Sequence, residues 1–461
     1  MKSLQEKKQP ALTWSLTALS LSMLLPSLST SIANVGLPSI ATAVDAPFGA
    51  VQWVVIAYLL ATTTLIVGAG RLGDTMGRRR VLLGGIVVFT AATLLCGLAP
   101  NLPLLIAARA VQGAGAACMM ALTMAMSADA MPEGRTGAAM GLLGTTSAVG
   151  TASGPALGGV LVEAFGWRAI FLVVVPLGVL AFALTRHALP GSLPSSSKSR
   201  FDATGTALLA IALGAYAMAV TVGNASLTVG LLVTAAAVLV AFVLIERRVA
   251  VPLVDVAMVR DPLLAASLIT SALVSTIVMT TLVVGPFHLA GTLDLAPALV
   301  GLVMSAGPAV SALTGVPAGR AADRFGTGAV VVAGLGGVLC GTVALFVMPA
   351  GAGVLGYLLP LVTTTSGYAL FQAGNNTAVM GHVPAHERGV VSGMLNLSRN
   401  LGLITGASVM GAVFAFAAGT TDVTAATPLE VARATHWTFG VAAMLAVLGL
   451  GVTLGARRHT R

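Results

Sequence analysis

The chain has 461 residues, of which 57% are hydrophobic and 8% are charged, whereas roughly 25% of the residues of a soluble domain are charged. The mean hydropathy of +0.96 excludes a soluble protein and indicates an all-α integral membrane protein. The net charge of +9 would suit a nucleic-acid partner. That class is excluded because the basic residues are distributed over the short segments between apolar runs.

Neither the N-terminus nor the cysteines indicate processing or a bound metal. Three lysines precede the first apolar run, as in a signal peptide, but no small-residue cleavage site follows, which predicts a retained first span. Cys96, Cys118 and Cys340 lie inside apolar runs without the spacing of metal ligands, so we interpret them as packing residues. We therefore expect no disulfide, no metal site and no cofactor.

Apolar runs of about 20 residues, the length that crosses a bilayer, follow one another along the chain. They predict fourteen membrane-spanning helices, at residues 12–36, 51–70, 81–99, 103–127, 137–161, 169–187, 204–222, 226–245, 263–287, 297–318, 328–348, 353–380, 389–417 and 436–455. The even number predicts that both termini lie on the same side of the membrane.

Lysine and arginine prefer short loops on the cytoplasmic side of a membrane. With both termini inside, all but four of the 24 basic residues fall in predicted cytoplasmic segments; the exceptions are Arg109, Arg168, Arg399 and Arg433. We therefore expect a multi-pass protein of a bacterial-type plasma (inner) membrane with both termini cytoplasmic. Its basic inner surface would contact anionic lipid head groups.

A charged loop between the second and third spans occurs twice in the chain. Its pattern returns after 249 residues at identical internal spacing: Gly70, Arg71, Asp74 and Gly77 correspond to Gly319, Arg320, Asp323 and Gly326. That distance contains eight predicted spans, whereas direct duplication of a six-helix unit would give six. Two additional helices are therefore expected between two six-helix bundles.

The expected division of the chain has five parts. A segment rich in proline and serine, typical of a linker, follows the sixth span. The parts are an N-terminal six-helix bundle at 1–187, a cytoplasmic linker at 188–203, two accessory helices at 204–245, a second linker at 246–262 and a C-terminal six-helix bundle at 263–461.

The fourth and fifth spans contain unusual residues for a membrane helix. Arg109, followed by Gln112, has apolar chain on both sides, and a charge at this depth is costly and marks a functional position by default. Snorkelling of Arg109 to the nearby outer interface is the alternative. In the fifth span, small residues and a proline make a smooth, flexible helix face; they are Gly150, Gly154, Pro155, Gly158 and Gly159.

Together these patterns resemble the major facilitator superfamily, specifically its fourteen-helix drug:proton antiporter group. The resemblance extends over nearly the whole chain and rests on the loop at 70–80, Arg109 with Gln112, the glycine-proline helix and a first-span motif around Asn34. It implies a major facilitator fold of two six-helix bundles plus two extra central helices. It also implies that Arg109 faces a cavity and takes part in proton coupling, and that the glycine-proline helix belongs to an antiporter.

The repeated loop is expected to act as a conformational latch. Asp74 can accept hydrogen bonds from a helix N-terminus or pair with an arginine across the interface between the halves. Positive-inside placement alone explains the arginines but not the repeated glycine and aspartate spacing. The expected latch residues are Gly70, Asp74, Gly77, Arg78, Arg79, Asp323 and Arg324.

The first span departs from the family's pattern, because Ser29 stands where the group commonly has an aspartate, five residues before Asn34. All fifteen acidic residues lie in or beside predicted loops. A buried carboxylate is the usual proton carrier and the usual counter-charge for a cationic drug. A neutral or weakly anionic lipophilic substrate is therefore favoured, and proton coupling would need Asp129, a water network at Arg109, or His288.

Polar side chains inside spans must find partners, because lipid offers none. Gln372, Asn375 and Asn376 are spaced to share one helix face, which predicts that this face turns to a cavity. The four methionines at 119, 120, 124 and 126 are interpreted as core packing rather than as an adaptable drug pocket. The expected proton-coupling and cavity residues are Asn34, Arg109, Gln112, His288, Gln372, Asn375, Asn376 and Arg399.

We expect a secondary membrane transporter, not an enzyme, that exports small lipophilic compounds such as drugs or antibiotics by proton antiport with alternating access. Its expected partners are the substrate, protons and membrane lipids, without nucleic acid, and it is expected to be a monomer. The alternatives are an uptake or facilitated-exchange transporter for a small metabolite and, more remotely, a non-transporting membrane sensor or enzyme. ATP-driven transport is not expected, because the chain has no Walker loop.

Overall fold

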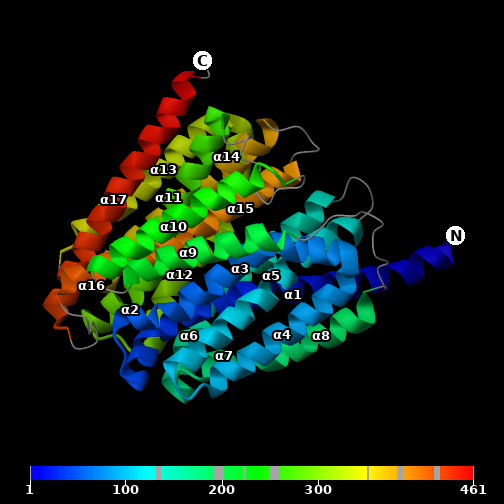
Figure 1. Ribbon diagram of the computed structural model, residues 1–461, viewed down its shortest axis with the longest axis horizontal. Coiled ribbons are helices and arrows are strands. Elements are labelled where there is room, and N and C mark those ends of the chain that lie inside the picture. The colour runs from blue at the N-terminus through cyan, green and yellow to red at the C-terminus, as the bar shows by residue number, and fades with distance from the viewer. Residues whose placement is uncertain are drawn as a thin grey trace.

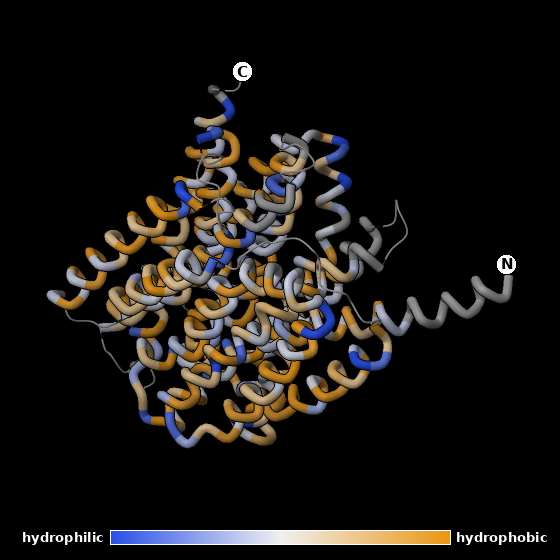
Figure 2. Tube along the Cα trace, turned by 45° about the vertical axis from the view of Figure 1, so that its right-hand side comes forward, coloured by the Kyte–Doolittle hydropathy of each residue, from blue (hydrophilic) through white to orange (hydrophobic). Residues whose placement is uncertain are grey.

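The computed structural model describes residues 2–130, 136–189, 202–221, 225–249, 260–349, 352–382, 388–419 and 426–459. Within these ranges, every regular element is a helix. Hydrophilic residues gather at the helix ends and apolar residues run along the helices (Figure 2). Fourteen of the described helices are long and apolar enough to cross a membrane, which confirms the predicted number.

In the first half of the chain, local sequence sets several helix ends. Asn101 accepts a hydrogen bond of 3.0 Å from the backbone amide of Leu104 and so caps the start of α5. Gly77, with φ of 97°, separates α3 from α4 in a conformation that favours glycine. The helices are α1 (Lys2–Val44), α2 (Phe48–Val51), α3 (Trp53–Met76), α4 (Arg78–Leu98), α5 (Leu102–Ala130), α6 (Thr136–Phe165), α7 (Ala169–Leu172) and α8 (Val174–Ala188).

The second half uses the same local signals. Asp261 caps α11 by accepting a hydrogen bond of 2.9 Å from the amide of Leu264, with a proline at the first helical position. Thr427 and Glu430 form a reciprocal capping box at the start of α17. The helices are α9 (Ala203–Thr221), α10 (Ala225–Glu246), α11 (Pro262–Gly291), α12 (Pro297–Phe325), α13 (Thr327–Phe346), α14 (Gly353–His382), α15 (Arg388–Thr405), a π-helical segment (Gly406–Met410), α16 (Gly411–Ala418) and α17 (Pro428–His459).

The two halves repeat one packing scheme. In the first half, α3 and α4 pack against α5, α4 packs against α8, and α1 packs against α6. In the second half, α12 and α13 pack against α14, α13 packs against α17, and α11 packs against α15. The repeated glycines adopt similar conformations, with φ of 97° at Gly77 and 83° at Gly326. The structure thus confirms two six-helix bundles, which the repeated loop predicted.

Helices α9 and α10 pair with each other and lie at the boundary between the two halves (Figure 1). The indole Nε1 of Trp53, on α3, donates a hydrogen bond of 3.0 Å to the hydroxyl of Thr221. The Tyr216 hydroxyl donates one of 3.2 Å to Thr405, on α15. The accessory pair is therefore attached to both bundles. The predicted linkers at 188–203 and 246–262 fall largely outside the described residues.

Candidate functional site

The two bundles are in close contact near one end, which carries the connections at 45–47, 166–168 and 292–296. We call it the closed end. A Cβ atom added to Gly159 of α6 would lie 3.0 Å from the Cα of Gly301 of α12. Next to this contact, the Glu163 carboxylate accepts a hydrogen bond of 3.0 Å from the backbone amide of Ala298. The α6 and α12 backbones therefore meet with no side chain between them.

Aromatic rings complete the closed end. Phe48, from the first bundle, lies edge-on to Phe287 with ring centroids 4.6 Å apart, and 5.7 Å from the ring of Phe414. The latter two residues belong to the second bundle. The amide of Gln52 lies directly against Gly411, where a Cβ atom would clash with it. All four of these side chains are buried at the interface.

A cavity of about 540 Å³ lies between the bundles, on the other side of this contact layer. That volume suits a drug-sized molecule. Its first-bundle wall is largely apolar and comprises Met23, Ile66, Met120, Met124, Ala148, Ser147 and Thr151. Its second-bundle wall mixes apolar and polar side chains, among them Val278, Leu282, Met304, Pro308, Tyr368, Gln372, Asn376, Asn396 and Arg399. We take this cavity as the candidate substrate site.

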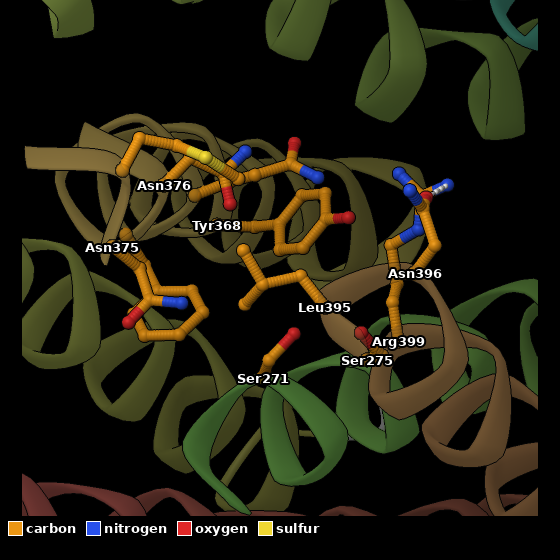
Figure 3. A pocket seen from close by; sticks show the side chains of 11 residues that line it. Ser271, Ser275, Tyr368, Asn375, Asn376, Leu395, Asn396 and Arg399 are labelled. Atoms are coloured by element: carbon orange, nitrogen blue, oxygen red, sulfur yellow. Dashed lines mark hydrogen bonds between the residues drawn. The ribbon is translucent and has the colours of Figure 1, made fainter. Parts of the chain in front are cut away.

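A polar side pocket of about 220 Å³ extends the cavity into the second bundle (Figure 3). Helices α11, α14 and α15 supply its walls. The Arg399 guanidinium donates a hydrogen bond of 3.0 Å to the side-chain oxygen of Asn396, and the Tyr368 ring lies beside this pair. The lining consists of Ser271, Ser275, Tyr368, Phe371, Gln372, Asn375, Asn376, Met380, Leu395, Asn396 and Arg399. The predicted polar face of α14 and the predicted Arg399 thus meet in one pocket.

Arg109 lies in a different place, completely enclosed within the first bundle. Its Nε donates a hydrogen bond of 2.7 Å to the carbonyl oxygen of Val54, and one Nη donates one of 2.6 Å to the side-chain oxygen of Gln112. The guanidinium stacks over the ring of Tyr58, 4.3 Å from its centroid. The side-chain nitrogen of Gln112 in turn donates a hydrogen bond of 2.7 Å to the Thr93 hydroxyl.

This enclosure contradicts the snorkelling alternative, because Arg109 has no exposed surface. Neither Arg109 nor Gln112 lines the cavity, so the network connects helices α3, α4 and α5 inside the bundle. Ser29 is next to it: the other Arg109–backbone contact, at 3.4 Å, is to the Ser29 carbonyl oxygen. The position where the family's pattern has an aspartate therefore faces this guanidinium.

The remaining predicted cavity residues are also buried away from the cavity. Asn34 donates a hydrogen bond of 3.0 Å to the carbonyl oxygen of Thr30 within α1. The His288 ring stacks on Tyr357 at 5.6 Å and its Nδ1 lies 3.1 Å from the Thr435 hydroxyl. His288 belongs to the closed end of the second bundle.

The predicted glycine-proline helix is α6, and its small residues serve two interfaces. Gly150, Gly154 and Gly158 face α1, where added Cβ atoms would meet the backbone or side chains of residues 24–32. Gly159 faces α12 of the other bundle. Pro155 lies inside the helix, and its carbonyl oxygen approaches Gly301.

The predicted latch loops lie at the opposite end of the molecule from the closed end. Asp323 and Arg324 are exposed, and Arg79 donates a hydrogen bond to the Arg186 carbonyl oxygen within the first bundle. Gly70 and Gly319 have open space where a side chain would lie. The side chains of Asp74 and Asp129 lie outside the described part of the chain, so the latch itself stays a prediction.

Sequence reasoning missed part of the site. Tyr368, Ser271 and Ser275 line the side pocket, yet small hydroxyls in membrane helices are too common to single out. Asn396 precedes Arg399 by three residues on the same helix, a spacing from which their hydrogen bond could have been predicted. The methionines are divided between two roles: Met120 and Met124 line the cavity, whereas Met119 and Met126 pack in the core.

Comparison with known proteins identifies the family. The sequence profile of the Major Facilitator Superfamily matches residues 19–407. The chain belongs to the major facilitator superfamily. This major facilitator protein is therefore a membrane transporter and not an enzyme. Its fold, with two six-helix bundles and two accessory helices, is the expected one.

The sequence is similar over most of its length to relatives whose names differ in function. Multidrug resistance protein Stp of Mycobacterium tuberculosis is 33% identical over 406 residues, covering 87% of this chain and 75% of the relative. Riboflavin transporter RibZ of Clostridioides difficile is 27% identical over 437 residues, covering 95% of each. Uncharacterized transporter YebQ of Escherichia coli is 31% identical over 384 residues, covering 82% of this chain and 84% of the relative.

Solved structures agree on the fold. A bacterial homologue of the human lysosomal transporter Spinster, in an inward-facing and unoccupied conformation, superposes with a TM-score of 0.73 at 14% identity, covering 98% of both chains. The nucleoside transporter NupG superposes with a TM-score of 0.68 at 13% identity, covering 96% of this chain and 99% of that one. At these identities the likeness concerns the fold alone.

Proposed function

We propose that this major facilitator protein exports small lipophilic compounds, drugs or antibiotics among them, in exchange for protons. The observation that carries the proposal is the cavity of about 540 Å³ between the bundles, with methionine-rich and aliphatic walls and a polar side pocket. Methionine side chains adapt to ligands of different shapes. The relative named as a multidrug resistance protein supports drugs as the substrate class.

The proposed cycle is alternating access by rocking of the bundles, taken as residues 1–187 and 263–461. With both termini cytoplasmic, the closed end faces outward and the cavity opens toward the cytoplasm. Release to the outside then requires separation of Gly159 from Gly301 and of Phe48 from Phe287. Glycine-to-glycine contact suits such an interface, because two smooth backbones separate without unlocking interdigitated side chains.

The described residues of the cavity wall include no carboxylate that could carry the exchanged proton. The candidates are the Arg109–Gln112 network, His288 and Asp129. Protonation of one of them would have to bias the two bundle arrangements, since a proton can drive exchange only through differential affinity for two states. The monomer is taken as the working unit, in an inner membrane with anionic lipids around its basic loops.

Inside-out membrane vesicles test the proposal. A neutral fluorescent lipophile, the primary amide of a diethylaminocoumarin carboxylate, should accumulate inside vesicles that contain the protein when respiration acidifies their interior. Accumulation should collapse with a protonophore and be absent from vesicles without the protein. Gradient-independent accumulation, or none, would count against proton-driven export.

The second candidate is uptake or facilitated exchange of a metabolite, favoured by the relative named as a riboflavin transporter. Riboflavin counterflow in proteoliposomes decides between the two. Exchange of labelled for unlabelled riboflavin without any proton gradient would support this candidate. Absence of this exchange, together with gradient-driven accumulation of the coumarin amide, would support the exporter.

A further inference from the structure

The side pocket carries the single charged side chain in the described walls of the cavity. Arg399 belongs to the lining of both the cavity and the side pocket, and it is only half-buried. No aspartate or glutamate is among the described lining residues of either space. The described part of the chain therefore gives this cation no counter-charge, and an uncompensated charge is costly at membrane depth.

The guanidinium has donors to spare. Of its five N–H groups, one is engaged by the side-chain oxygen of Asn396 at 3.0 Å, the one acceptor that Arg399 reaches among the described residues. Asn396 lies one helical turn before Arg399 on α15, so this hydrogen bond holds the guanidinium along its own helix. The other donors are available to a ligand in the cavity.

Among the described residues, the surroundings of Arg399 add neutral hydrogen-bonding groups and no acid. Gln372 and Asn376 line both the side pocket and the cavity, and Ser275 lies beside Arg399 in the side pocket (Figure 3). Amides and hydroxyls can donate to an oxyanion and do not neutralise it. A planar guanidinium matches a carboxylate in two parallel hydrogen bonds.

The facing wall has the opposite character. Met23, Ile66, Met120 and Met124 line the cavity from the first bundle, and their side chains favour an apolar surface. The cavity thus has one cationic polar corner and one apolar wall. The second membrane-embedded arginine, Arg109, does not compete for this role, because it is fully enclosed and engaged by Val54 and Gln112.

Building on the proposed transport function, we propose that Arg399 and Asn396 form a head-group subsite that selects amphipathic monoanions, namely a carboxylate on an apolar body. The carboxylate pairs with Arg399 in the side pocket, while the apolar body lies against the first-bundle wall with its three methionines. Lipophilic cations are selected against, because they would bring a like charge to Arg399 with no carboxylate to receive it.

The test compares two probes of one shape, a diethylaminocoumarin carboxylate and its primary amide, on the purified full chain in detergent and in inside-out vesicles. The wild-type protein should bind the carboxylate about tenfold more tightly than the amide, as expected for a charge-assisted hydrogen bond. Arg399→Gln should abolish that preference by weakening carboxylate binding alone, and Arg399→Lys should restore part of it. Arg433→Gln, which removes an exposed arginine outside the cavity, is the matched control and should leave both affinities unchanged.

The outcomes separate this inference from the transport proposal. Equal binding of the two probes by wild type, or an unchanged preference in Arg399→Gln, overturns the head-group subsite and leaves export of the amide intact. Preferential, Arg399-dependent binding of the carboxylate without gradient-driven movement of either probe supports the subsite and contradicts the exporter. If Arg399→Gln loses both probes, the wild-type preference and the Arg399→Lys variant decide.

Discussion

Gly159 of α6 and Gly301 of α12 lie backbone against backbone across the interface between the two bundles, and a Cβ atom added to either would lie 3.0 Å from the Cα of the other. This contact joins the helix that carries the glycine-proline pattern to the opposite half of the transporter. In the proposed alternating-access cycle, these two backbones separate when the closed end opens.

Gly159→Val should therefore favour separation of the closed end. Overpacking of a tight contact costs about 1–3 kcal/mol, which shifts the ratio of the two states by roughly fivefold or more. A cysteine placed at Ala46 should react faster with a membrane-impermeant maleimide, and transport should slow. Gly230→Val, at a helix position with open space around it, is the control. Unchanged labelling in Gly159→Val would contradict a role in closure.

The two glycines that end the repeated loops should respond differently from those that begin them. Gly77 and Gly326 have φ of 97° and 83°, where any other residue is strained by about 2 kcal/mol. Gly70 and Gly319 lie within helices and have open space around them. Alanine at either of the first pair should lower the melting temperature in detergent, whereas alanine at either of the second pair should not. Equal effects at all four positions would refute the conformational explanation.

Arg109 and Ser29 offer a test of the missing carboxylate. One Nη of Arg109 has no hydrogen-bond partner among the described residues, and the Ser29 carbonyl oxygen lies 3.4 Å from the other. Ser29→Asp should place a carboxylate beside the guanidinium and stabilise the fold by about 2 kcal/mol. Thermal melting checks this, with the uncharged Ser29→Asn as the matched variant. Equal melting temperatures for the two would show that the carboxylate does not reach Arg109.

Arg109→Lys provides the complementary measurement. A lysine keeps the charge but lacks the planar fork that reaches the Val54 carbonyl and the Gln112 side chain at once. We expect it to destabilise the protein by about 2 kcal/mol. A neutral effect would mean that charge, rather than geometry, is what the site requires.

The accessory helices should couple the two bundles through α9. Tyr216 donates a hydrogen bond to Thr405 on the second bundle, while Thr221 accepts one from Trp53 on the first. Tyr216→Phe and Thr405→Val should each cost roughly 0.6 kcal/mol, the usual size of such bonds in membranes. The double variant should cost no more than one single variant. Thr234→Val, on α10, removes a hydroxyl bonded only within its own helix and is the control; additive losses at 216 and 405 would refute the coupling.

The sequence was sufficient for everything that depends on local pattern. Apolar run lengths predicted the fourteen spans, and the 249-residue offset between Gly70 and Gly319 predicted two bundles with two extra helices. The spacing of Gln372, Asn375 and Asn376 likewise placed them on one face of α14. These features follow from helix geometry and from the cost of polar groups in lipid, both of which act along a single helix.

By itself, then, the sequence determined the number of membrane helices, the internal duplication and the polar face of α14. Only the tertiary structure decided that Arg399 lines the cavity while Arg109 is enclosed in the first bundle, that Gly159 meets Gly301, and that α9 contacts both halves. The physical reason is that, outside a few polar positions, the helix faces that meet lipid and those that meet other helices are equally apolar. Hydropathy therefore does not distinguish a face that meets lipid from one that meets another helix, and side-chain packing between distant segments makes that choice.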